Sequence, residues 1–150
     1  MKEPWAYGLY SSSYFKTTRL KFTEFGLEYA VEDSIDALGF SEATPIQAQA
    51  IPLILQQKDL IACAQTGTGK TAAYVIPTVN ELTGRESSHS RALILAPTRE
   101  LVEQIDQNIE ALSYFTGVSS VSVIGGNNHK QFDRQKFGLR NGADIIIATP

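Results

Sequence analysis

Eight consecutive residues in the first half of the chain have the types and spacing needed to hold a polyphosphate. Glycine at positions 67 and 69 lets the backbone turn sharply and approach a phosphate closely. Successive backbone N–H groups then point into one concavity, and the positive end of the following helix adds to the field. We therefore predict nucleotide-phosphate binding by Ala64, Gln65, Thr66, Gly67, Thr68, Gly69, Lys70 and Thr71.

Two side chains at the end of this segment are predicted to contribute to catalysis. Lys70 would reach the outer phosphates, and the hydroxyl of Thr71 would bind Mg²⁺. The usual motif begins with glycine, whereas Ala64 stands there in this chain. Alanine is small enough to be tolerated at that point, and a chance match is expected in roughly one chain in a hundred of this length.

The composition is that of an ordinary globular domain, with 43% hydrophobic and 19% charged residues. The net charge of −3 gives no sign of nucleic-acid binding, so any contact with a nucleic acid must be local. Cys63 is the single cysteine, which we expect to be a small buried side chain in a reducing, cytoplasmic setting. His89 and His129 are predicted to be surface residues. No apolar run approaches the roughly 20 residues that cross a membrane.

The elements that must position the phosphate segment begin with two helices. Val31, Ile35 and Leu38 share one helical face, and Gly39 is a stop signal. Thr44-Pro45 then opens a second helix, because a hydroxyl suits the cap and proline suits the first turn. The short apolar run 60–64 is predicted to be the strand before the phosphate loop. A helix follows over 72–79, which Pro77 could disturb.

The second half of the chain alternates apolar runs with amphipathic stretches. The run 92–96 ends at Pro97 and has the pattern of a strand buried on both faces. This alternation predicts the α/β class, with a mainly parallel sheet flanked by helices. The remaining predicted elements are a surface loop at 84–90, helices over 101–112 and 129–140, and strands over 118–124 and 144–149.

Several segments between Phe22 and Pro150 resemble the motifs of DEAD-box ATP-dependent RNA helicases, and they follow one another in the same order along the chain. The stretch 39–47 (Gly-Phe-Ser-Glu-Ala-Thr-Pro-Ile-Gln) resembles their adenine-recognising Q motif, and the phosphate loop has their alanine-first form. Further matches are Phe22 upstream, Pro97 to Leu101, the Gly125-Gly126 doublet, and Gln135, Leu139 and Gly142 leading to Ala148-Thr149-Pro150. The resemblance implies a RecA-like P-loop NTPase domain that binds ATP and Mg²⁺.

The resemblance also assigns the adenine contacts. Gln47 can donate and accept at once, as reading the edge of adenine requires. Phe22 would stack on the base, although a core aromatic is the alternative and Phe25 is the competing ring. Phe40 and Thr44 belong to the same implied site. Ala43 replaces the proline usual in the family, a change expected to affect the stiffness of the loop more than its contacts.

The implied RNA contacts are to the backbone and independent of base sequence. Separately, an arginine in a first helical turn is usually solvated, and a Gly-Gly after a strand is usually a turn. Because these residues follow successive parallel strands, we expect them at one edge of the sheet, where ligands of such folds bind. The predicted RNA-binding residues are Pro97, Thr98, Arg99, Gly125, Gly126 and Thr149.

The chain contains no Asp-Glu-Ala-Asp sequence, and it stops within a motif at Thr149-Pro150. We expect residues 1–20 to be a flexible extension and 21–150 to be a partial ATP-binding domain, incomplete at its C-terminus and monomeric. The implied function couples ATP hydrolysis to RNA unwinding. The alternative is a nucleotide- and RNA-binding fragment without turnover. An unrelated kinase or transporter ATPase is disfavoured by the Gln47 segment and by Pro97 to Leu101.

Overall fold

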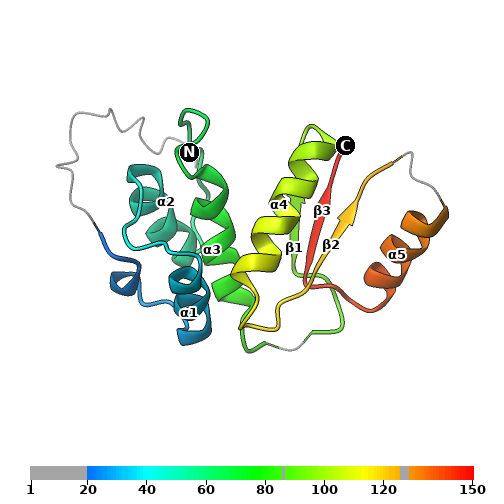
Figure 1. Cartoon of the computed structure of the whole chain (residues 1–150), viewed down its shortest axis with the longest axis horizontal. Coiled ribbons are helices and arrows are strands. Elements are labelled where there is room, and N and C mark those ends of the chain that lie inside the picture. Colours follow the sequence, from blue (N-terminus) through cyan, green and yellow to red (C-terminus); the bar gives the residue numbers. More distant parts are fainter. Residues whose placement is uncertain (1–19, 86, 126–128) are drawn as a thin grey trace, which may run out of the picture.

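Helices and strands alternate along the chain, as expected (Figure 1). The computed structural model describes residues 20–85, 87–125 and 129–150, so most of the expected extension 1–20, Gly126 and the side chain of His129 lie outside the described residues. The elements are η1 (Phe22–Glu24), α1 (Tyr29–Ala37), α2 (Pro45–Leu55), α3 (Lys70–Leu82), β1 (Ala92–Leu95), α4 (Arg99–Leu112), β2 (Ser120–Val123), α5 (His129–Arg140) and β3 (Ile145–Ala148).

Three strands form a parallel sheet in the order β1-β3-β2. Leu95 and Val123 both pair with Ala148, so the three strands end at the same level. This confirms the predicted α/β class with a parallel sheet. Among the described residues, no helix is both long and apolar enough to cross a membrane.

The helix signals in the sequence act as predicted. Thr44 is the N-cap of α2, and Gly39 follows α1 with a φ of +74°, a conformation that suits glycine. The third helix runs past Pro77 to Leu82 and is longer than expected. Its buried side chains pack against α2 and α4, so it joins the helical half of Figure 1 (α1 to α3) to the half that holds the sheet.

The expectation that β1 is buried on both faces is wrong. Leu93 is 62% exposed and Leu95 is 61% exposed, whereas Ala92 and Ile94 are half-buried. Side chains alternate between the two faces of a strand, and α4 packs over only one face of the sheet. No described segment covers the other face along β1, so its leucines stay exposed.

The predicted strand at 60–64 is also absent. These residues adopt no regular structure, and Ile61 is 91% exposed. A strand needs a neighbour to satisfy its backbone N–H and C=O groups, and no described strand pairs with this run. For the same reason Cys63 is exposed, which corrects the expectation of a buried thiol.

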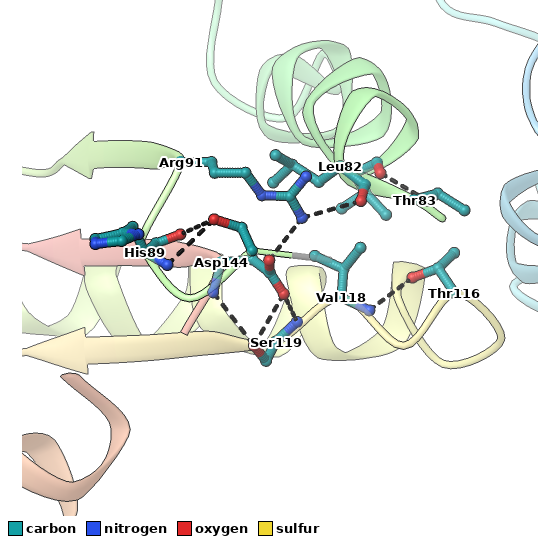
Figure 2. Close-up of polar contacts among 10 residues, drawn as sticks. Leu82, Thr83, His89, Arg91, Thr116, Val118, Ser119 and Asp144 are labelled. Carbon is teal, nitrogen blue, oxygen red and sulfur yellow. Dashed lines mark hydrogen bonds and ion pairs between the residues drawn. The ribbon is translucent and has the colours of Figure 1, made fainter. Parts of the chain in front are cut away.

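A polar network joins the residues that precede the three strands (Figure 2). Asp144 precedes β3, and its Oδ1 accepts a hydrogen bond from Arg91 Nη2 at 2.6 Å. Its Oδ2 accepts from both the N–H and the hydroxyl of Ser119, each at 3.0 Å. Arg91 Nη2 also donates to the carbonyl of Leu82 at 3.0 Å, which ties the end of α3 to the same network.

These contacts lower the pKa of Asp144. Burial raises the pKa, but the hydrogen bonds from Ser119 and Arg91 and the positive charge of Arg91 outweigh it. The carboxylate of Asp144 is therefore ionised in the folded chain at neutral pH. Because its folded pKa lies below the unfolded value of about 3.9, its stabilising contribution is present at neutral pH and is lost as the pH falls through the folded pKa.

Replacing Asp144 by Asn should lower the free energy of unfolding by about 2 kcal/mol at pH 7, since the guanidinium of Arg91 loses its counter-charge. The difference from the unmodified chain should shrink as the pH drops below about 4. Urea unfolding between pH 3 and pH 7 measures both effects. The exposed Asp36→Asn control should change stability by less than about 0.5 kcal/mol. A pH-independent loss in Asp144→Asn would contradict the assignment.

Candidate nucleotide site

The segment 64–71 forms an open loop that leads into α3. Gly67 and Gly69 have φ values of +80° and +87°, in the left-handed region that glycine adopts without strain. Gly69 is the N-cap, so the first backbone N–H groups of α3 lie at the end of the loop. Thr66 and Gly67 are exposed. The loop therefore has the backbone geometry that an anion at a helix N-terminus requires.

The ammonium group of Lys70 lies against carbonyl groups of the same loop. Its Nζ donates to the carbonyl oxygens of Ala64 and Gln65, the latter at 2.8 Å. The hydroxyl of Thr68 donates to the same Gln65 carbonyl at 2.7 Å. An ammonium group has three N–H donors, so Lys70 keeps one for a ligand in this position.

Gln47 links the second helix to the phosphate loop. Its side chain is buried at 5% exposure, and its Oε1 accepts from the N–H of Thr44 at 2.9 Å. Its Nε2 donates to the carbonyl of Gly69 at 3.2 Å. That carbonyl also accepts the first helical hydrogen bond of α3, from Ala73 N–H at 3.0 Å. The structure thus brings together two segments that lie 22 residues apart.

Gly69 is required here for a second reason that the sequence did not suggest. A Cβ at this position would lie 2.5 Å from Gln47 Nε2 and 3.2 Å from the hydroxyl of Thr44. Only a residue without a side chain allows α2 to approach the loop this closely. The glycine therefore serves the Gln47 contact as well as any phosphate.

The hydroxyl of Thr44 is a buried polar atom without a hydrogen-bonding partner among the described residues. Thr44 and Gln47 are arranged as a capping box, but only the bond from Thr44 N–H to Gln47 Oε1 has hydrogen-bonding geometry. An unsatisfied buried hydroxyl carries an energetic cost, and such groups often serve a ligand.

Phe22 lies in the hydrophobic core at 4% exposure. Its ring stacks on Phe40 with centroids 6.3 Å apart and contacts Phe25 at 5.9 Å in a tilted arrangement. Phe22 is thus beside the 39–47 segment, as the resemblance implied. In this conformation the ring is covered, which fits the alternative of a core aromatic, and its stacking on adenine stays a prediction. Phe40 is partly exposed.

Ala43 makes a contact that was not expected from the sequence. Its N–H donates to the carbonyl of Leu20 at 2.8 Å, next to a bridge between Lys21 and Glu42. Proline, the residue usual in the resembling family, has no N–H and could not form this bond. The replacement therefore changes a contact that holds the segment before η1 against the 39–47 segment.

Tyr74 is a neighbour of the loop that sequence reasoning missed. It follows Thr71 by one helical turn, and the two side chains are hydrogen-bonded. Burial raises the pKa of the Tyr74 phenol, and the hydrogen bond with Thr71 lowers it by less. The spacing of three residues in a helix was the available signal. Tyr74 thus lies one helical turn from the hydroxyl that is predicted to bind Mg²⁺.

The described residues among those predicted to bind RNA, which exclude Gly126, lie beyond the ends of the three strands. Pro97, Thr98 and Arg99 follow β1 and are exposed, and Thr98 caps α4 by accepting from Leu101 N–H at 3.2 Å. Gly125 follows β2 and is exposed, while Thr149 follows β3 and donates its N–H to the carbonyl of Val123 at 3.4 Å. The start of α3 lies at the same end of the molecule (Figure 1).

The arrangement fits a nucleoside triphosphate with Mg²⁺. The loop amides at the start of α3 and the Lys70 ammonium suit phosphates, the Thr71 hydroxyl suits Mg²⁺, and Gln47 and Thr44 offer polar groups close by. Each of these assignments stays a prediction.

Comparison with known proteins finds helicases. The family model described as DEAD/DEAH box helicase matches residues 44–150. The chain is 45% identical over 130 residues to the ATP-dependent RNA helicase CshA of Listeria monocytogenes, covering 87% of this chain and 24% of that protein. It is 43% identical over 138 residues to the ATP-dependent RNA helicase RhlB of Pectobacterium carotovorum, covering 88% and 31%.

The structural comparison gives the same result. The crystal structure of the RNA helicase Prp28 from Chaetomium thermophilum bound to ADP has a TM-score of 0.78 and 41% identity, and the match covers 91% of this chain and 33% of that chain. The chain thus spans between 24% and 33% of the length of these three relatives.

The contact between Gly69 and Gln47 can be tested by a double-mutant cycle. Gly69→Ala should destabilise the chain through both the positive φ and the collision with Gln47 Nε2. In Gly69→Ala/Gln47→Ala the collision is gone, so the loss of stability should be at least about 1 kcal/mol smaller than the sum of the single losses.

Gly67→Ala is the matched control, because its φ is also positive but a Cβ there would meet nothing within 4 Å. Its loss should add to that of Gln47→Ala within about 0.5 kcal/mol in urea unfolding. Additive losses at position 69 would show that the two residues are not in contact.

Proposed function

Since the chain belongs to the DEAD/DEAH box helicase family, we propose that it provides the adenine-nucleotide site and part of the RNA-backbone site of an ATP-dependent RNA helicase. The observation that carries this proposal is the hydrogen bond between Gln47 Nε2 and the Gly69 carbonyl. It places an amide side chain beside the phosphate loop. A base and its phosphates can then be held by one continuous surface.

Gln47 retains the capacity to bind adenine. A side-chain amide has two N–H donors and two acceptor positions on its oxygen. In the structure Nε2 uses one donor for Gly69, and Oε1 uses one acceptor position for Thr44 N–H. One donor and one acceptor position are left, which is the pair that the edge of adenine requires. A carboxylate could not supply this pair.

Phosphate binding would fall to the loop itself. The backbone N–H groups at the start of α3 supply partial positive charge, and Lys70 supplies a full one. The Thr71 hydroxyl would hold Mg²⁺, which neutralises phosphate charge when bound. Lys70 now contacts the carbonyls of Ala64 and Gln65, and its ammonium would exchange at least part of these bonds for phosphate oxygens.

RNA would be held along the ends of the strands. Exposed Thr98, Arg99 and Gly125 offer a hydroxyl, a guanidinium and a backbone amide at one edge of the sheet, with Thr149 beside them. Such groups bind phosphates and 2′-hydroxyls and do not read bases. In the whole protein, we propose, ATP hydrolysis is coupled to the separation of paired RNA strands that are bound at the carboxyl ends of the β-strands.

A second possibility is that this chain acts as a binding module without turnover. Phosphoryl transfer depends on charge neutralisation and positioning by several groups together. The chain contains no Asp-Glu-Ala-Asp sequence that could hold Mg²⁺ and position a water molecule. Nucleotide and RNA binding would then be its own contribution.

The adenine assignment predicts a difference between nucleotides. Gln47→Ala should weaken ATP binding by about tenfold and GTP binding by less than about threefold, because the hydrogen bonds to adenine are lost. Fluorescence titration with labelled ATP and GTP measures both affinities. Lys70→Ala serves as the control and should weaken both nucleotides by a similar factor, since it removes a phosphate contact. Equal losses in Gln47→Ala would refute adenine recognition.

The absence of the acidic sequence predicts that the 150-residue chain does not hydrolyse ATP. Release of inorganic phosphate in the presence of Mg²⁺ and single-stranded RNA should stay at the level of a protein-free sample. RNA-stimulated release that disappears in Lys70→Ala would show that the chain turns over by itself. It would also remove the binding-module alternative.

A further inference from the structure

The sheet has a free edge along β2. Within the described residues β2 pairs only with β3. The carbonyls of Ser119 and Val123 accept from Ile145 N–H at 3.0 Å and from Thr149 N–H at 3.4 Å. Backbone groups of a strand in a parallel pair point alternately toward the partner and away from it. Those of Ser120 and Ser122 therefore point outward, where no described strand pairs with them.

A groove of about 650 Å³ runs along this edge. Helix α4 forms one wall, helix α5 forms the other, and β2 lies between them. The contact from Gln135 Nε2 to the carbonyl of Ile124 at 3.3 Å closes the groove near the end of the strand. The lining residues are Glu103, Asp106, Ser120, Val121, Ser122, Ile124, Asp133, Gln135, Phe137 and Gly138.

The walls are held to opposite faces of β2. Asp106 on α4 accepts hydrogen bonds from the hydroxyls of Ser120 at 2.5 Å and Ser122 at 2.6 Å. On the other face Gly138 brings α5 close to Val121, since a Cβ on Gly138 would lie 2.8 Å from Val121 Cγ2. Helix α4 packs on one face of β2 and helix α5 packs on the other (Figure 1). Neither helix therefore covers the outer edge of the strand.

The chemistry of the groove suits a basic peptide. Three carboxylates line it, from Glu103, Asp106 and Asp133, and no lysine or arginine is among the described lining residues. The ring of Phe137 is 69% exposed and offers an apolar contact. These carboxylates would repel the phosphates of a nucleic acid. Opposite charges on a peptide would be attracted, and its backbone would match the outward groups of Ser120 and Ser122.

We propose that this groove binds an extended basic segment of a protein partner, which adds to the sheet as a strand beside β2. Since β2 is four residues long and a strand rises about 3.3 Å per residue, the paired segment would span about four residues. Its backbone bonds to Ser120 and Ser122, its basic side chains lie on the α4 side against Glu103, and its apolar side chains lie on the α5 side against Phe137, where Asp133 adds negative charge. The surface is distinct from the proposed ATP and RNA sites.

The competing explanation is that the carboxylates only protect the edge. Charged residues beside an edge strand commonly prevent pairing with other chains. In that case no peptide would bind, and removing the charges would make the chain self-associate. The two explanations therefore predict opposite results for the same variant.

A labelled peptide, acetyl-Gly-Lys-Val-Lys-Val-Lys-Gly-amide, is the probe. Titration should shift the backbone amide signals of Ser120 and Ser122 in ¹⁵N–¹H spectra of the chain, and fluorescence anisotropy should give a saturable affinity. The same peptide with both its lysines and its valines N-methylated should lose at least about tenfold in affinity, because it lacks the N–H donors of a strand on either side. Equal binding of the methylated peptide, or no shift at Ser120 and Ser122, overturns the proposal.

Charge reversal on the protein gives the second test. Glu103→Lys/Asp133→Lys should weaken the peptide by about tenfold, and Asp36→Lys on α1, an exposed residue outside the groove, should leave the affinity unchanged. Unchanged binding in the double variant, or its self-association without peptide binding to the parent chain, overturns the proposal. Displacement of the peptide from the groove along β2 by single-stranded poly-U RNA would also overturn the proposal.

Discussion

One carbonyl oxygen joins the two parts of the proposed nucleotide site. The carbonyl of Gly69 accepts the first helical bond of α3 from Ala73 and a second bond from the buried amide of Gln47. Helix α2 is thereby held at a fixed distance from the start of α3. Any movement of the phosphate loop must change the environment of Gln47, and the reverse also holds. Adenine and phosphate recognition are therefore mechanically linked in this proposal.

The two ends of the sheet are used differently. At the start of the strands, Asp144 binds Arg91 and Ser119, so charge and backbone donors satisfy each other within the chain (Figure 2). At the other end the strands finish at the same level, and Pro97, Thr98, Arg99 and Gly125 beyond them are exposed. A stabilising network at one end leaves the polar groups at the opposite end available for ligands. The groove along β2 is a third surface, and its acidic lining distinguishes it from the proposed RNA-binding surface at the carboxyl ends of the strands.

Much of the fold could be predicted because its signals are local. Gly39 ends a helix through its backbone freedom, and Thr44-Pro45 begins one through a cap and a preset φ. The phosphate loop was recognisable because close approach to an anion demands glycine at defined positions. The predictions that failed concern burial and the strand at 60–64. Leu93, Leu95 and Cys63 are apolar or nearly so, yet they are exposed because no described segment covers them.

The sequence by itself therefore determined the glycine-containing turn before α3, the alternation of helices and strands, and the resemblance that the family comparison confirmed. Each of these depends on residue types a few positions apart, where backbone geometry and hydrogen bonding are local. Only the tertiary structure decided that Gln47 meets Gly69, that Phe22 is covered by Phe40, that 60–64 is not a strand, and that no described strand pairs with the outer edge of β2. These facts depend on which distant segments come into contact, and residue spacing alone does not specify such contacts.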